Sequence, residues 1–222
     1  MTVRERPALV AHVGQVPEAG SFVTADAAGA PLLVIRQDDG SVRAVANVCR
    51  HRGARVETEP AGRRKMFACP YHRWCYTRTG ALRSIPFEDG FAGAGRADLG
   101  LVEHPSALTG NLVWVVPDRS AVPSVSVSAD IAGAAFVRAV TVETGAPWAE
   151  VEASVGAEPL APGTFVRWAD GFAELVSVRP AGPRLARTAI GLWLLAGPDA
   201  RLEGDIVPGW EQRIARMREV WA

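Results

Sequence analysis

The apolar residues in the first half of the chain occur in short runs that end at turn residues. The runs lie at residues 8–10, 22–23, 32–35, 42–48 and 108–116. Asp39-Gly40 falls between two of them, and Asp-Gly between apolar runs is a strong signal for a β-hairpin. Thr109-Gly110 marks another turn. Short strands separated by turns at intervals of about 8–12 residues predict a small antiparallel β-domain.

The second half predicts four more strands and a closing helix. The strands are expected at residues 136–142, 165–168, 173–178 and 187–195. Pro208 suits the first turn of a helix. Apolar residues recur after it at helical spacing, namely Trp210, Ile214, Met217 and Trp221. Residues 117–124 contain two prolines and are typical of a linker. We therefore expect an α+β chain with domains at residues 1–118 and 119–222.

Composition narrows the classes of function. The formal net charge is zero, which predicts no general affinity for nucleic acid or anionic membranes. The longest apolar run, residues 189–197, is too short to cross a bilayer, and the first residues lack the apolar core of a signal peptide. Only three cysteines occur, Cys49, Cys69 and Cys75, so a disulfide-stapled secreted fold is not expected. A soluble, cytoplasmic protein is the expectation.

One cysteine and one histidine occur in each of two short segments of the first domain. The segments are Cys49-Arg50-His51-Arg52-Gly53 and Cys69-Pro70-Tyr71-His72, with 17 residues between His51 and Cys69. In a Rieske [2Fe–2S] cluster two thiolates hold one iron and two imidazoles hold the other. The spacing therefore favours such a cluster, with Cys49, Cys69, His51 and His72 as its ligands.

A zinc site is the alternative for these four residues. Zinc also binds two cysteines and two histidines, but zinc fingers usually group cysteine with cysteine and histidine with histidine. The two types alternate in this chain, so we favour the iron–sulfur cluster. The other two histidines, His12 and His104, are interpreted as ordinary surface or hydrogen-bonded residues.

At these residues the chain resembles the Rieske non-haem iron oxygenases, also called ring-hydroxylating oxygenases. The resemblance extends over about residues 5–117 and is carried by four stretches, Asn47–Gly53, Cys69–Tyr76, Gly80–Leu82 and Ile85-Pro86. It implies that an all-β Rieske domain is followed by a helix-grip domain. In the family that second domain holds a mononuclear iron with two histidines and one carboxylate.

The second half of this chain contains no histidine, so no mononuclear iron is expected there. Its strands and closing helix resemble a truncated helix-grip domain, and residues 148–153 resemble a helix of that domain. An unrelated α+β module is the alternative. The leading hypothesis is an oxidoreductase component that transfers electrons through its cluster. The other hypotheses are a true oxygenase with a partner-supplied or unusual iron site, and a structural subunit whose cluster stabilises the fold.

The resemblance also implies partners. A ferredoxin or reductase would donate electrons, a full-length oxygenase subunit is a further candidate, and a homo- or hetero-oligomer is expected. The segment from Arg50 to Arg83 contains nine basic residues and two acidic ones. Such a basic region could attract an acidic redox protein or pair with carboxylates of neighbouring domains or subunits. Nucleic acid is not an expected partner.

Three residues beside the second segment complete the sequence-based interpretation. Trp74 and Tyr76 are expected to cover the cluster and exclude water. Cys75 lies between them and is expected to be a buried, inert thiol that points away from the cluster. Respiratory Rieske proteins carry a serine near the second histidine, and this chain does not. We therefore expect a reduction potential near the low end of the Rieske range, about −150 mV.

Overall fold

The computed structural model describes residues 2–86, 96–181, 187–200 and 206–220. Three small sheets form the N-terminal part. The first sheet has the strand order β1 (Ala8–His12), β11 (Leu112–Val115) and β10 (Ser106–Thr109). The second has the order β5 (Ala61–Arg63), β2 (Ser21–Ala27), β3 (Ala30–Arg36), β4 (Val42–Ala46) and β9 (Glu103–His104). The third has the order β6 (Phe67–Ala68), β7 (Cys75–Tyr76) and β8 (Leu82–Ser84). All of their strand pairs are antiparallel.

A fourth, five-stranded sheet dominates the C-terminal part. Its order is β12 (Ala135–Thr144), β16 (Arg187–Ala196), β15 (Phe172–Ala181), β14 (Thr164–Ala169) and β13 (Glu158–Ala161). Three α-helices of the described residues accompany it: α1 (Ala129–Gly133), α2 (Trp148–Ser154) and α3 (Ile206–Val220). Short 3-10 turns at Val13–Gln15 and Arg96–Leu99 lie in the N-terminal part. None of the helices within the described ranges is long and apolar enough to span a membrane.

Two turns illustrate how the sequence directs this architecture. Gly40 has φ +82° between β3 and β4, and its N–H donates to the Gln37 carbonyl at 3.2 Å. The Asp-Gly hairpin is therefore confirmed. At the second turn Gly110 and Asn111 both have positive φ, which suits the tight turn of a two-residue hairpin. Leu108 thus lies in β10, before the turn, and residues 108–116 are a hairpin and not one strand.

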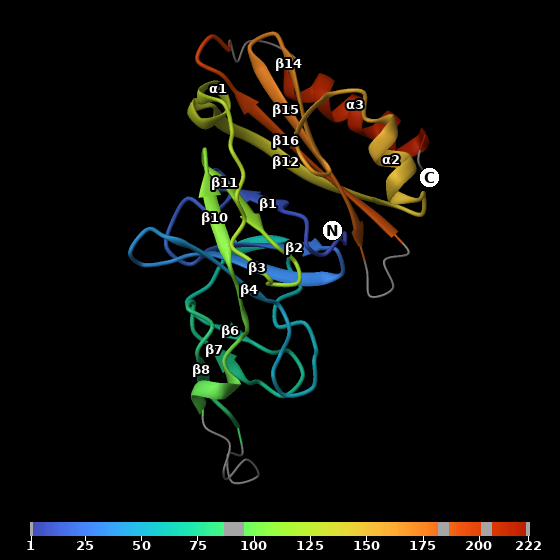
Figure 1. Cartoon of the computed structure of the whole chain (residues 1–222). Helices are drawn as coiled ribbons and strands as arrows, with labels where there is room; N and C mark the ends of the chain where they lie inside the picture. The colour runs from blue at the N-terminus through green and yellow to red at the C-terminus, as the bar shows by residue number, and fades with distance from the viewer. Residues whose placement is uncertain (1, 87–95, 182–186, 201–205, 221–222) are drawn as a thin grey trace.

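The C-terminal sheet is enclosed on both faces. On one face Trp210 and Ile214 of α3 are buried against Val176 and Leu192. On the other face Trp193 joins a core that includes Leu9, Trp114 and Leu195. The two parts of the chain therefore share a hydrophobic core, and Figure 1 shows β1 and β11 directly below the C-terminal sheet.

The predicted fold class, mostly antiparallel sheet with a C-terminal helix, is confirmed. Several short elements were not predicted, among them β5, β13 and α1. The helix α1 lies between the expected linker and the first expected strand of the second half. The closing helix begins at Ile206, two residues before Pro208, while the side chains of Met217 and Trp221 lie outside the described residues. The boundary between residues 118 and 119 stays a prediction.

Candidate iron–sulfur centre

The first candidate loop turns back on itself immediately after Cys49. The Cys49 N–H donates to the Ala54 carbonyl at 2.7 Å, and the Gly53 N–H donates to the Cys49 carbonyl at 2.9 Å. Gly53 has φ +76°, a conformation that glycine adopts without a steric penalty. The loop therefore places His51 at its tip and Cys49 at its base.

The second loop repeats the same hydrogen bonds at the same offsets. The Cys69 N–H donates to the Trp74 carbonyl at 2.9 Å, and the Arg73 N–H donates to the Cys69 carbonyl at 3.0 Å. Arg73 occupies the place of Gly53 and also has positive φ, at +58°. A non-glycine residue in this region costs about 1–2 kcal/mol, so the closure of the second loop is strained where the first is not.

The two loops bring like side chains together. Cys49 and Cys69 are each 2% exposed, belong to one core cluster, and adjoin each other. The rings of His51 and His72 lie 4.6 Å apart at an interplanar angle of 81°. His51 is half-buried and His72 is exposed. The sulfur pair therefore lies inside the domain and the imidazole pair lies at its surface.

Tyr76 contacts the buried end of this arrangement. Its hydroxyl lies 3.3 Å from the Cys49 sulfur and accepts the Arg50 N–H at 3.0 Å. A thiolate can only accept, so beside an ionised Cys49 the hydroxyl must be the donor. Burial, followed by the bond to Cys49, raises the pKa of Tyr76, which keeps the phenol protonated. Tyr76 was expected only to cover the cluster. Its hydrogen bond with the Cys49 sulfur could not be read from the sequence.

Trp74 covers the half-buried histidine. Its side chain is 2% exposed, and its ring stacks on His51 with centroids 5.1 Å apart and an interplanar angle of 8°. Desolvation, then the nearby positive charges of His72 and Arg52, lowers the pKa of His51. The neutral imidazole that results is the form that binds metals.

The chemistry of this donor set fits a bound cation. Burial raises the pKa of the Cys49 thiol, and the adjacent Cys69 raises it further, although hydrogen bonds from Tyr76 and the His51 main chain lower it. The Cys49 thiol therefore resists ionisation unless a metal ion compensates its charge. Across the described residues, no three His, Cys, Asp or Glu side chains form a site for a single ion. The four ligand candidates form two pairs, the division that a Rieske cluster uses.

Seven of the nine basic residues between Arg50 and Arg83 fall into two groups. Four of them form ion pairs within the N-terminal part: Arg55–Asp26 at 3.7 Å, Arg63–Glu18 at 2.6 Å, Arg64–Glu57 at 3.1 Å and Arg78–Asp38 at 2.5 Å. Arg50, Arg52 and Arg73 are exposed beside the candidate ligands, with no ion pair to any residue in the described ranges. Tyr71, next to His72, is 72% exposed.

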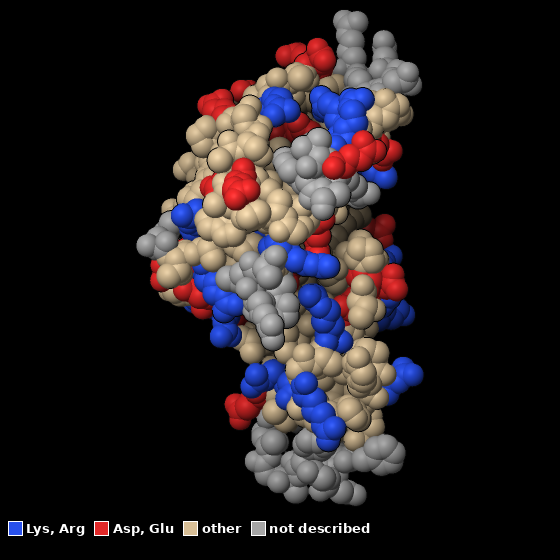
Figure 2. All heavy atoms as spheres, turned by 90° about the vertical axis from the view of Figure 1, so that its right-hand side faces the viewer, with Lys and Arg blue, Asp and Glu red and all other residues tan. Residues whose placement is uncertain are grey.

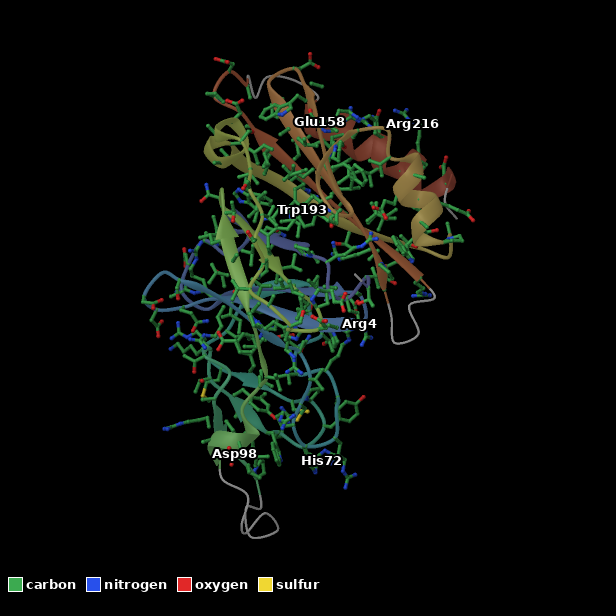
Figure 3. All side chains as sticks on the ribbon, viewed as in Figure 1. Arg4, His72, Asp98, Glu158, Trp193 and Arg216 are labelled. Carbon is green, nitrogen blue, oxygen red and sulfur yellow. The ribbon has the colours of Figure 1, made fainter. Side chains whose placement is uncertain are left out.

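This surface lies at the end of the molecule that is remote from the C-terminal sheet. Figure 3 shows His72 near the lower end, and Figure 2 shows Lys and Arg side chains spread over the lower half of the face turned toward the viewer. The exposed imidazole is therefore surrounded by positive charge and is accessible to another macromolecule.

The remaining candidates lie apart from the two ligand pairs. Cys75 is half-buried and not fully buried as expected. His12 is buried; its Nδ1 accepts the Gly14 N–H at 2.9 Å, and its ring stacks on Phe136. His104 is buried in β9, opposite Ala44 of β4. Both histidines are therefore core residues and not surface residues.

Comparisons with known proteins identify the N-terminal part. Residues 6–101 match the family model of the Rieske [2Fe-2S] domain. Over 93 residues the chain is 42% identical to biphenyl 2,3-dioxygenase subunit alpha of Rhodococcus jostii (strain RHA1), covering 41% of this chain and 20% of that protein. It is 44% identical over 96 residues to the large oxygenase component of the naphthalene 1,2-dioxygenase system of a Ralstonia species, covering 42% of this chain and 22% of that protein.

Solved structures extend the similarity of fold to nearly the whole chain. A quaternary ammonium Rieske monooxygenase, CntA, in complex with an inhibitor has a TM-score of 0.74 at 16% identity, covering 97% of this chain and 76% of that chain. Naphthalene 1,2-dioxygenase with bound indole has a TM-score of 0.61 at 20% identity, covering 98% and 70%. The alignments to the curated relatives span only about a fifth of their length. Residues 6–101 are thus a Rieske [2Fe–2S] domain, homologous to the corresponding region of ring-hydroxylating dioxygenase α subunits, in a chain with the fold of Rieske oxygenases.

Proposed function

We propose that Cys49, Cys69, His51 and His72 bind a Rieske [2Fe–2S] cluster and that the chain transfers electrons in a system of the ring-hydroxylating-oxygenase type. The observation that supports this most strongly is the pair of equivalent loops, which join two buried sulfurs and two imidazoles at one end of the domain. The bound cluster would accept and release one electron at a time.

The residues around the ligands each contribute to that role. Trp74 shields the His51 side from water, and Tyr76 donates to the Cys49 sulfur, which stabilises negative charge there. His72 remains exposed, so a partner protein can approach the ligand ring directly. The protein interior therefore adjusts the electronic environment while the surface gives access.

The partner is proposed to be an acidic electron-transfer protein, a ferredoxin or a reductase. Arg50, Arg52 and Arg73 present positive charge beside the exposed ring, and Tyr71 offers an exposed aromatic contact. Complementary charge increases the rate of association and aligns the partners, and it weakens as ionic strength rises. The rate of reduction by an acidic donor is therefore expected to fall with added salt.

Hydroxylation is proposed to need a second protein. In non-haem iron oxygenases two histidines and a carboxylate hold the iron and leave positions open for oxygen. The last histidine of this chain is His104. A full-length oxygenase subunit that carries a complete triad is therefore the proposed acceptor.

The test supplies the full chain with a reductase, labelled dioxygen and aromatic substrates, and counts iron in the same sample. The expected result is reversible reduction of the chain without labelled product, and product only when an oxygenase subunit with the triad is added. Labelled product from the chain alone, lost when a third iron is removed, would support the alternative of a complete oxygenase. A centre that physiological donors cannot reduce would support a structural subunit.

A further inference from the structure

Arg179 is a buried cation at the junction between the two parts of the chain. It lies in β15 and is 5% exposed. Its Nε donates to the Asp26 carbonyl at 2.6 Å, and its Nη1 donates to the Leu9 carbonyl at 3.2 Å and to the Ser177 hydroxyl at 3.3 Å. Two of these three partners are main-chain carbonyls of β2 and β1, so the guanidinium is fixed by neutral groups.

The charge of Arg179 is only partly compensated. It forms no ion pair with a carboxylate of the described residues, and the Asp26 carboxylate is the one charge that favours its protonated form. Asp26 is also shared, because Arg55 pairs with it at 3.7 Å and the Gly29 N–H donates to it at 2.9 Å. Burial lowers the pKa of Arg179 to about 10, so the guanidinium stays charged at neutral pH. A buried charge without a full partner is costly.

A cavity adjoins this arginine. It has a volume of about 670 Å³. Its lining is mixed: apolar residues that include Val10, Val23, Ala139 and Trp193 alternate with polar and charged residues, Arg179 among them. Figure 3 shows Trp193 at the junction between the C-terminal sheet and the strands below it. The volume falls within the range of about 300–1,000 Å³ that is usual for small-molecule sites.

Two of the three carboxylates that line the cavity pair with arginines outside it. Glu57 pairs with Arg64 at 3.1 Å, and Glu143 pairs with Arg187 at 3.0 Å. Asp26 remains to balance two cations, Arg55 and Arg179. Counted together with Arg64 and Arg187, which lie outside the lining, four cations stand against three carboxylates, an excess of one positive charge.

We propose that this cavity binds a small organic monoanion, a carboxylate with an apolar body, with the carboxylate against Arg179. A guanidinium matches a carboxylate in charge and in planar geometry. The apolar walls would take up the body of the ligand, and Trp193 offers an aromatic surface. Part of the lining, from Arg55 to Ala61, directly follows the first cluster loop, but none of the four candidate ligands lines the cavity. The proposal does not depend on the proposed electron transfer.

The test uses 4-fluorobenzoate as the probe and neutral 4-fluorobenzamide as its matched control. Binding is followed by fluorine NMR line broadening and by the melting temperature of the full chain with its cluster in place. The expected result is saturable binding of the benzoate and a rise in Tm of roughly 2–5 °C at saturating probe. The benzamide should bind at least tenfold more weakly, because it lacks the charge that Arg179 requires.

Three variants locate the site. Arg179→Met should weaken benzoate binding at least tenfold. Arg138→Met should leave it unchanged, because it removes an exposed arginine of the same sheet that does not line the cavity and pairs with Glu211, which does not line it either. Ala139→Phe keeps Arg179 but fills the cavity, so it should also weaken benzoate binding at least tenfold. If Arg179→Met does not fold, Ala139→Phe still tests whether benzoate binds in this cavity. Equal binding of benzoate and benzamide, no saturable binding at millimolar probe, or binding unaffected by the cavity variants would each overturn the proposal.

Discussion

At the scale of single residues, the contact between Tyr76 and Cys49 has the most direct consequence for redox behaviour. The hydroxyl lies 3.3 Å from a sulfur that would carry negative charge, and it is buried with its own proton retained. Hydrogen bonds to cluster sulfurs favour the reduced, more negative state and thereby raise the potential. The potential expected from the missing serine alone, about −150 mV, therefore omits a contribution that acts in the opposite direction.

Tyr76→Phe is expected to lower the reduction potential by roughly 20–60 mV, the equivalent of one hydrogen bond of about 0.5–1.5 kcal/mol in a one-electron couple. Protein-film voltammetry measures this shift. Tyr71→Phe is the matched control, because Tyr71 is the other tyrosine of the chain and is 72% exposed. A potential that is unchanged in Tyr76→Phe, or lowered equally in both variants, would contradict the proposed role of the hydroxyl.

At the scale of elements, the two loops depend on positive φ at equivalent places. Gly53 has φ +76°, and a Cβ added there would meet no atom within 4 Å. Gly53→Ala therefore adds backbone strain without a clash, and we expect a loss of about 1–2 kcal/mol of stability together with faster release of the cluster. Thermal unfolding and the decay of visible absorbance measure the two effects.

Gly40→Ala is the control for this prediction. Gly40 has φ +82° and equally open surroundings, but it lies in the hairpin between β3 and β4. Both variants should lose similar stability, while only Gly53→Ala should release the cluster faster. Equal rates of release in the two variants would mean that the first loop has no special dependence on Gly53.

His12 is expected to make the stability of the fold depend on pH. It lies at the junction of β1, the following 3-10 turn and β12. Burial lowers its folded-state pKa from 6.5 to about 4. The unfolded chain therefore binds more protons than the folded chain between these values, so stability falls as pH falls through this window. At pH 5 the loss relative to pH 7 is about 2 kcal/mol from this residue.

His12→Asn keeps an acceptor for the Gly14 N–H but cannot titrate. Between pH 7 and 5 its unfolding free energy, measured with urea, should fall by about 2 kcal/mol less than that of the unchanged chain. Identical losses in the two proteins would show that His12 is not held neutral in the folded state.

Local signals explain why some elements could be predicted from the sequence. Asp39-Gly40 defines its hairpin through a few adjacent residues, and long apolar runs identified β15 and β16. The strand β13 is short and contains Pro159, which weakens any strand signal. The helix α1 has five residues, and its main indicator is Ser128, whose hydroxyl accepts the Ile131 N–H.

In the candidate site, too, the sequence predicts local features but not contacts between residues that are far apart along the chain. Its four ligand candidates stand in two short segments, so the sequence alone could select them. The bond between Cys49 and Tyr76 spans 27 positions, and the bond from Arg179 to Asp26 spans 153. Such partners depend on how sheets are stacked, which no local pattern encodes, and both the hydroxyl contact and the buried arginine therefore emerged only from the structure.

At the scale of the whole molecule, the proposed redox centre and the proposed carboxylate site occupy different regions. The loops lie at the end remote from the C-terminal sheet, while Arg179 and its cavity lie where the sheet meets β1 and β2 (Figure 1). The C-terminal sheet is joined to the Rieske domain through a common core and through Trp193, whose indole N–H donates to Gln15 at 2.9 Å.

The most direct test of the account measures iron, acid-labile sulfide and zinc in one sample of the purified chain, with its paramagnetic spectrum after reduction. The predicted result is about two irons and two sulfides per chain with a Rieske-type signal. Cys69→Ser should abolish both, while Cys75→Ser should leave them nearly unchanged. Stoichiometric zinc without sulfide, or loss of the signal in Cys75→Ser, would contradict the assignment of Cys49, Cys69, His51 and His72 as cluster ligands.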